Sequence, residues 1–281
     1  MGTYKMSLGD RMKRHERVPY GILTRRTPVI IRVDGKAFHT LTKGLNKPHD
    51  QAMVLSMTEA AIALMRELQG AQIAYIQSDE ISILLTDYTN FSTEAWFDYE
   101  VQKMVSISAA IATAYFNEMW KKLLLNREEM LKLNGQMAVF DTSELHKWSK
   151  KAEQVALFDS RCFNVPREEV VNYFLWRQQD AIRNSIQGLA QANFSHKELH
   201  GLSCDQLQEK LWQEKQINWN DLEVWKKRGW CVTKKTVLNE GQDGTEPSYR
   251  TMIEPDWDIP DFGKDRSYID QYVYPQEEEG K

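Results

Sequence analysis

Apolar and polar positions alternate or recur periodically along the first two thirds of the chain, which predicts a regular series of elements. Short apolar runs that end at turn residues predict strands at 28–35 (PVIIRVDG) and 155–166 (VALFDSRCFNVP). Apolar residues recur at helical spacing over 50–69, and a second long helix is predicted over 94–125. The stretch AYIQSDEISILL (74–85) predicts a hairpin, because two strand-like runs flank one polar clump.

This order of strand, helix, strand, strand, helix, strand is typical of the ferredoxin-like, split βαβ arrangement, an α+β fold. Residues 126–154 then form a helical insertion before the last strand. A strong helical pattern follows at 167–191, and capping boxes at Ser195 and Ser203 predict a helical pair. Two strand-like segments near the C-terminus predict a peripheral hairpin. We therefore expect three regions: 1–166 with its insertion, a helical region packed on it at 167–238, and an acidic tail at 239–281.

The polar clump in the hairpin contains two adjacent carboxylates, Asp79 and Glu80. Unpaired carboxylates are costly to bury, so either they form an ordinary turn or they bind a metal. Asp34 ends the first strand, which commonly lies beside the hairpin in a split βαβ sheet. Two carboxylates and the Gly35 carbonyl are hard oxygen ligands suited to magnesium. Two such ions about 4 Å apart could stabilise an in-line phosphoryl displacement.

The segment after the first strand, GKAFH (35–39), could bind a triphosphate through its backbone N–H groups. Asp-Gly and Ser-Asp are also common turn sequences, so both the turn and the metal interpretation stay open on these residues alone. The chain has no GxxxxGK[ST] sequence, which excludes a P-loop enzyme.

Charge is unevenly distributed along the chain. The formal net charge is -4, but the 239–281 tail carries -8 and the rest therefore +4. Basic clusters occur at 11–17, 146–151 and 225–230, and the last two contain tryptophans. Such clusters either contact phosphates or are simply solvated faces.

Other site classes find little support in the sequence. Three widely spaced cysteines suggest neither a disulfide framework nor a zinc ribbon, and they are typical of a reducing cytoplasm. His196 and His200 lack the HExxH pattern, and no Ser or Cys nucleophile is paired with His39 or His49. Apolar stretches are far shorter than the roughly 20 residues that span a bilayer, and the N-terminus lacks a signal-peptide core, so we expect no membrane association.

Four segments together resemble the tRNA(His) guanylyltransferase family, and most closely its bacterial, archaeal and phage branch of reverse polymerases. In matching order and spacing they are RVDGKAFHTLTKGLNKP (32–48), AYIQSDEISILL (74–85), FDSRCFNVP (158–166) and YFLWRQQDAIRNSI (173–186). The resemblance extends over about residues 10–235. It implies a palm like that of polymerases and cyclases, run in reverse to add nucleotides to the 5′ end of tRNA.

The resemblance also implies roles for individual residues. Asp34, Asp79 and the Gly35 carbonyl would bind two Mg²⁺ ions, with Glu80 supporting these catalytic carboxylates. ATP or GTP would activate the RNA 5′ end, which the 3′ hydroxyl of the incoming nucleotide then attacks. The residues expected at the nucleotide are Asp34, Gly35, Lys36, Ala37, Phe38, His39, Lys47, Ser78, Asp79 and Lys103.

Two departures from the eukaryotic pattern change these expectations. Ile182, Arg183, Asn184 and Ser185 stand where eukaryotic enzymes have His-Ile-Asn-Asn. This difference weakens strict tRNA(His) recognition and favours template-directed repair of truncated 5′ ends. Asn184 keeps the match, and Arg183 is either a tRNA contact or a surface ion-pair partner. Glu100 replaces a residue that is usually basic.

The resemblance further implies a cytoplasmic homotetramer. Two alternatives remain open on the sequence, a palm-fold nucleotide cyclase and a non-catalytic tRNA-binding protein. The cyclase would turn over nucleotides without RNA. A binding protein facing phosphates would gain from losing the carboxylate pair.

Overall fold

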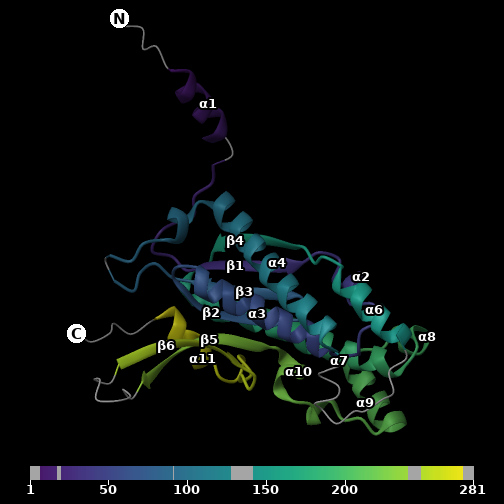
Figure 1. Cartoon of the computed structure of the whole chain (residues 1–281). Helices are drawn as coiled ribbons and strands as arrows, with labels where there is room; N and C mark the ends of the chain where they lie inside the picture. Colours follow the sequence, from purple (N-terminus) through teal and green to yellow (C-terminus); the bar gives the residue numbers. More distant parts are fainter. Residues whose placement is uncertain (1–6, 18–19, 91, 128–141, 240–247, 275–281) are drawn as a thin grey trace, which may run out of the picture.

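One six-stranded antiparallel sheet organises the chain (Figure 1). Our computed structural model describes residues 7–17, 20–90, 92–127, 142–239 and 248–274. The strands are β1 (Val29–Gly35), β2 (Ala71–Gln77), β3 (Glu80–Leu85), β4 (Phe158–Asn164), β5 (Trp230–Asn239) and β6 (Ser248–Asp256). The α-helices are α1 (Leu8–Arg17), α2 (Phe38–Leu41), α3 (Gln51–Glu67), α4 (Val101–Leu125), α6 (Thr142–Ala152), α7 (Arg167–Asn193), α8 (His196–Leu199), α9 (Cys204–Lys215), α10 (Val224–Arg228) and α11 (Ser267–Val273). Short 3-10 turns are η1 (Trp96–Tyr99) and η2 (Trp219–Asp221).

The strand order is β4-β1-β3-β2-β5-β6, which confirms the predicted α+β class. The first four strands come in the predicted chain order, with α3 and α4 as the long helices between them. Asp34 of β1 lies opposite Glu80 on β3 and opposite Asp159 on β4. The end of β1 therefore lies directly beside the β2–β3 hairpin.

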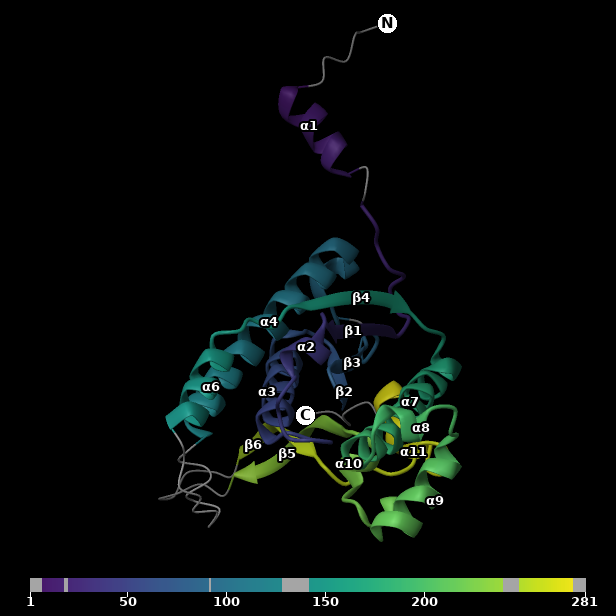
Figure 2. The same cartoon turned by 90° about the vertical axis from the view of Figure 1, so that its right-hand side faces the viewer.

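Helices cover both faces of the sheet (Figure 2). The α3 and α4 helices pack on one face over alternate β1 residues such as Ile31 and Val33. The α7 and α11 helices pack on the other face, over residues such as Ile30 and Tyr75. Strand alternation makes this division possible, because consecutive side chains point to opposite faces. Both β2 and β3 are buried on both faces, which explains their nearly continuous apolar runs.

The C-terminal hairpin lies in the main sheet, where the sequence predicted a peripheral position. Strand β5 pairs with β2, and β6 becomes the edge strand. The physical reason is that β2 would otherwise be an apolar edge strand, and β5 covers it with buried Trp230 and Val232. Helix α11 also belongs to the predicted tail, and 240–247 and 275–281 lie outside the described residues.

Two helical predictions need adjustment. The predicted 94–125 helix begins only at Val101, because Phe97, Asp98 and Tyr99 have positive φ and form a turn before it. Of the predicted 126–154 insertion, α6 is described, and 128–141 lies outside the described residues. Both predicted capping boxes are present, at Ser195 and Ser203. Helix α1 has no buried residue and extends away from the body (Figure 1). In the described ranges no helix is long and apolar enough to cross a membrane.

Candidate active site

The end of β1 and the turn of the β2–β3 hairpin bring Asp34 and Asp79 together. The Gly35 amide donates a hydrogen bond of 3.0 Å to the Asp79 carbonyl, which ties the two segments directly. The two aspartates come from positions 45 residues apart in the chain and meet at one end of the sheet.

The backbone at this junction tolerates few substitutions. A Cβ atom at Gly35 would lie 2.3 Å from the Phe38 ring, so any side chain there would displace that ring. Ala37 (φ 55°) and Ser78 (φ 49°) occupy the left-handed region, which is costly for residues with a side chain. Such local strain is frequent at functional sites, where the surrounding structure enforces it.

Negative charge accumulates at this end of the sheet. Burial raises the pKa of Asp34, and the Glu80 and Asp159 carboxylates raise it further. Burial also raises the pKa of Asp79, and the Asp34 carboxylate adds to this rise. Burial and the neighbouring carboxylates therefore disfavour the ionised forms, which a divalent cation would stabilise.

The donors present suit magnesium, which prefers carboxylate and carbonyl oxygens. Asp34 and Asp79 would hold the ion with the Gly35 carbonyl. Among the described residues no group of three or more His, Cys, Asp or Glu side chains could hold a metal, so any such site depends on these two carboxylates and the backbone.

Glu80 is held in a buried ion pair. Both of its carboxylate oxygens accept 2.8 Å hydrogen bonds from Arg177 on α7, and Ser82 Oγ donates a weaker one of 3.2 Å. Arg177 also contacts Asp180 at 2.9 Å. Because both of its carboxylate oxygens already accept hydrogen bonds, Glu80 is held in a fixed position beside the two aspartates and would support them there.

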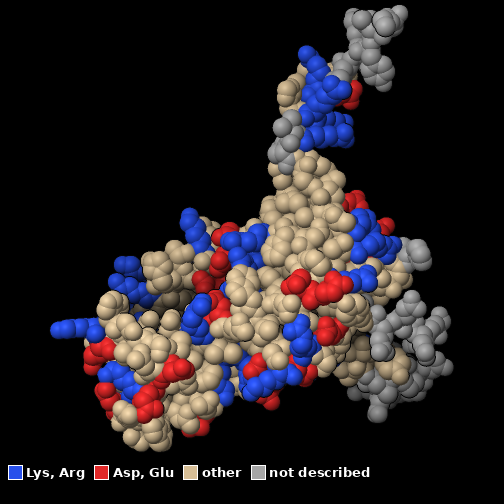
Figure 3. All heavy atoms as spheres, turned by 180° about the vertical axis from the view of Figure 1, so that it is seen from behind, with Lys and Arg blue, Asp and Glu red and all other residues tan. Residues whose placement is uncertain are grey.

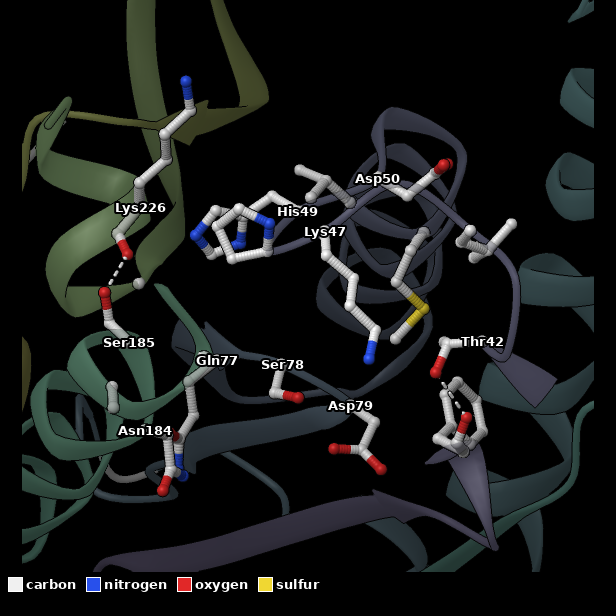
Figure 4. A pocket seen from close by; sticks show the side chains of 18 of the residues that line it. Thr42, Lys47, His49, Asp50, Gln77, Ser78, Asp79, Asn184, Ser185 and Lys226 are labelled. Carbon is white, nitrogen blue, oxygen red and sulfur yellow. Dashed lines mark hydrogen bonds between the residues drawn. The ribbon is translucent and has the colours of Figure 1, made fainter. Parts of the chain in front are cut away.

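A cavity of about 560 Å³ opens beside Asp79, within the size range of ligand pockets. In Figure 4, Lys47 extends its ammonium group toward Ser78 and Asp79, and Gln77 and Asn184 also line the cavity. The combination of lysine, hydroxyl and amide side chains suits a phosphorylated ligand with a polar base. Its lining comes from the β1–α2 junction, the loop before α3, the hairpin turn, α7 and α10.

Most of the residues expected at the nucleotide line this cavity. Those that do are Gly35, Ala37, Phe38, His39, Lys47, Ser78 and Asp79. Asp34 adjoins it on the α7 face of the sheet. The Gly35 and Lys36 amides already bond to the Asp79 and Leu157 carbonyls, so an anion-binding nest could use only the amides from Ala37 onward.

The structure does not bring Lys36 or Lys103 into the cavity. The Lys36 side chain is exposed to solvent. Lys103 lies in the first turn of α4, where its ammonium pairs with Glu100 at 2.9 Å. The neighbouring Val101 amide bonds to Gly21, near the start of β1, so Lys103 lies toward the opposite end of that strand.

Of the two residues expected at tRNA, Asn184 lines the cavity and Arg183 does not. Arg183 is exposed and forms an ion pair with Asp180. Because Asp180 also contacts Arg177, Arg183 ends a chain of charges that begins at Glu80.

The sequence did not predict which residues form the far wall of the cavity. Trp225, Lys226 and Lys227 of α10 form this wall, and Ser185 on α7 donates a 2.6 Å hydrogen bond to the Lys226 carbonyl. The basic cluster at 225–230 was the available signal, but nothing local connects it to a site some 150 residues earlier.

Side chains outside the cavity hold the loop before α3 in place. Arg127 pairs with Asp50 at 2.9 Å and lies over the Trp148 ring. The Lys151 ammonium donates a 2.9 Å hydrogen bond to the Lys43 carbonyl. Two residues of the predicted insertion, Arg127 and Lys151, therefore hold the loop that carries Lys47.

Comparison with known proteins shows extensive similarity. The family described as tRNAHis guanylyltransferase matches residues 9–166. An uncharacterized protein of Acanthamoeba polyphaga mimivirus is 26% identical, over 83% of this chain and 79% of its own length. A probable tRNA(His) guanylyltransferase of Drosophila melanogaster is 28% identical, over 80% of this chain and 74% of its own length.

Solved structures agree with the sequence comparison. A bacterial tRNA(His) guanylyltransferase (Thg1)-like protein in complex with ATP is 42% identical, has a TM-score of 0.78, and aligns over 95% of this chain and 99% of its own. A bacterial protein of the same description in complex with GTP is 39% identical, with a TM-score of 0.75 and coverage of 96% and 100%. The Saccharomyces cerevisiae enzyme is 21% identical with a TM-score of 0.57, covering 78% and 91%, and shares the fold.

Proposed function

Because the chain belongs to the tRNA(His) guanylyltransferase family, a family of nucleotidyltransferases, we propose that it is a magnesium-dependent 3′-5′ nucleotidyltransferase that extends the 5′ end of tRNA. The observation that carries this proposal is the position of Asp34 and Asp79 at the edge of a nucleotide-sized cavity. Similar bacterial proteins were solved with ATP and GTP, which supports the same nucleotides as substrates here.

The proposed reaction has two steps. In the first, a 5′-phosphate oxygen of the RNA attacks the α-phosphorus of ATP or GTP and pyrophosphate leaves. In the second, the 3′ hydroxyl of the incoming nucleotide attacks the RNA 5′ phosphorus, and the nucleoside monophosphate from the first step leaves. Bound Mg²⁺ would supply Lewis-acid stabilisation of the attacking and leaving oxygens.

The residues of the chain have separate roles in this scheme. Asp34, Asp79 and the Gly35 carbonyl hold the metal. Lys47 and Ser78 face the same space and would bind the phosphates of the nucleotide, while the α10 wall with Lys226 closes the other side. Glu80 keeps its place through Arg177 and fixes the strand end that carries Asp79.

We further propose that the opposing RNA strand directs which nucleotide is added. The sequence at 182–185 lacks the His-Ile-Asn-Asn of the eukaryotic enzymes, which favours repair over strict addition of guanosine to tRNA(His). The homotetramer and the cytoplasmic location expected from the family belong to this proposal as well.

The test uses tRNA that lacks its first nucleotide and carries a 5′ monophosphate, incubated with each nucleoside triphosphate and Mg²⁺. We expect extension that follows the opposing base and changes when that base is changed. Asp79→Asn should reduce the rate by about a hundredfold, because it weakens a metal contribution of several kcal/mol to the transition state. Asp205→Asn, an exposed carboxylate on α9, is the matched control. Nucleotide turnover without RNA would favour a cyclase instead.

A further inference from the structure

On the face of the sheet under α7, charged side chains form rows across the strands, and the nucleotide cavity gives these rows no role. Side chains on this face cross β4, β1 and β3 in register. The row at the end of the sheet is Asp159, Asp34 and Glu80, the next row is Arg161, Arg32 and Ser82, and the third is Phe163, Ile30 and Leu84. Two arginines therefore lie one row behind the proposed metal ligands, about 7 Å farther along the strands.

Helix α7 contributes a second wall that faces these rows. Tyr173, Trp176, Arg177, Asp180 and Arg183 recur at three- and four-residue spacing, so they lie along one side of the helix. Tyr173 contacts Phe163 of β4 through its ring and Ser82 of β3 through its hydroxyl. The two walls therefore meet near Tyr173.

The space between the walls widens toward the carboxylates. Ile30 is fully buried, whereas the Arg161 and Asp159 side chains nearer the site are 47% and 61% exposed. Trp176 is 53% exposed, and the Arg177 guanidinium lies over its ring at 4.3 Å, so the exposed part of the indole is open to a ligand. Figure 3 shows blue and red side chains beside a hollow on the rear face. We call this space, between the β4–β1 face and the side of α7 that carries Trp176, the α7 wedge.

Arg32 marks the wedge as a binding surface. Its Nε atom is buried, and within the described part of the chain it has no hydrogen-bond partner. An unsatisfied buried donor costs about 1–3 kcal/mol, so its retention suggests an acceptor that arrives with a ligand. Arg161, its neighbour on β4, pairs with Asp159 of its own strand. A phosphate at this row would accept hydrogen bonds from Arg32 and compete with Asp159 for Arg161.

The wedge and the nucleotide cavity reach the aspartates from different sides. Asp79 lines the cavity, whereas Asp34 is absent from its lining and points toward the wedge with Glu80 and Asp159. A reaction that joins two substrates at these carboxylates needs two separate binding surfaces that both lead to them. The cavity accounts for one substrate, and the charge and shape of the wedge suit a strand of phosphates with an exposed base.

We propose that the α7 wedge binds the 5′ strand of the acceptor RNA, with backbone phosphates on Arg32 and Arg161 and a base near the 5′ end against Trp176. The RNA terminus then reaches Asp34 and Asp79 opposite the nucleotide. Exposed aromatic rings stack nucleobases, and arginine forks match phosphate geometry. This inference rests on the proposed function and assigns the surface that holds its RNA substrate.

The test is fluorescence anisotropy with 5′-monophosphorylated, truncated tRNA over a range of salt concentrations. Arg161→Gln should weaken binding about fivefold to tenfold and lower the slope of log affinity against log salt by about one. Trp176→Ala should weaken binding about tenfold, and Trp176→Phe should restore most of it. Binding of a fluorescent GTP analogue should stay unchanged in all of them. Arg66→Gln, on the opposite face of the sheet, is the matched control.

One variant should act in the reverse direction. Asp159→Asn removes the carboxylate that now competes for Arg161, so tRNA should bind more tightly, whereas a purely structural Asp159–Arg161 pair predicts no gain. Unchanged tRNA affinity and salt slope in Arg161→Gln would overturn the proposal. Weaker GTP binding with normal tRNA binding would also overturn it, and would assign the arginines to the triphosphate. A wild-type protein that extends no tRNA would refute the proposed function, which is a separate result.

Discussion

At the scale of single residues, the balance of charge around Asp79 depends on one buried arginine. Arg177 neutralises Glu80 through two 2.8 Å hydrogen bonds, and both side chains are almost fully buried. Breaking a buried pair costs more than replacing it, because the remaining charge has no partner. The Glu80–Arg177 pair is therefore a sensitive point for stability and for the geometry of the metal ligands.

Replacement of Arg177 by Met should lower the free energy of unfolding by about 3–5 kcal/mol, because Glu80 is left as an uncompensated buried charge. The double variant Arg177→Met/Glu80→Gln should recover most of this loss. Urea denaturation in magnesium-free buffer measures both effects. Strictly additive losses in the double variant would contradict this explanation.

The half-buried imidazole of His49 predicts a dependence of stability on pH. Burial lowers the pKa of His49 below 6.5, and the Lys226 charge lowers it further. The unfolded chain then binds a proton more readily than the folded one, so stability falls as pH decreases through about 6.5. The melting temperature of His49→Gln should drop less between pH 7.5 and 5.5 than that of the wild type. His196→Gln, at an exposed position, should behave like the wild type.

At the scale of elements, local pattern was enough to place the strands and helices of the first four-stranded unit. Apolar runs end at turn residues in β1 and β4, and helical spacing is clear in α3. The pairing of β5 with β2 could not be predicted, because it joins segments about 155 residues apart with no local signal. The Arg177 contact with Glu80 and the α10 wall of the cavity were missed for the same reason.

The start of α3 provides a test of how one cap supports the cavity. Asp50 accepts a hydrogen bond from the Ala52 amide and also pairs with Arg127. Asp50→Asn keeps an amide oxygen for the cap but loses the ion pair, whereas Asp50→Ala loses both. We expect Asp50→Ala to be less stable than Asp50→Asn by about 1 kcal/mol, measured by chemical denaturation. Equal stability of the two variants would show that the cap contributes nothing here.

At the scale of the whole molecule, the sheet joins the regions that the sequence suggested as separate. Strands β5 and β6 continue the sheet from β2, and Trp230 packs in the same core as α3 and α4. Helix α7 spans from the sheet core to the cluster formed with α9. The chain should therefore unfold as one cooperative unit.

A chain that ends at Arg228 tests this continuity. Removal of β5 exposes the inner edge of β2 and deletes Trp230 from the core. We expect residues 1–228 to show no cooperative thermal transition by circular dichroism and to be cleaved rapidly by protease. A chain that ends at Tyr274 is the control and should melt like the full-length protein. A sharp transition in the shorter chain would instead indicate an independently folding N-terminal domain.

The two contacts that hold the loop before α3 have a consequence for how substrate choice changes over evolution. Arg127 and Lys151 fix this loop through Asp50 and the Lys43 carbonyl, yet neither residue touches the paired aspartates. Substitutions at Arg127 or Lys151 should therefore reshape this side of the cavity while the metal ligands stay in place. Exchanging these two residues between homologues offers a direct route to altered nucleotide preference.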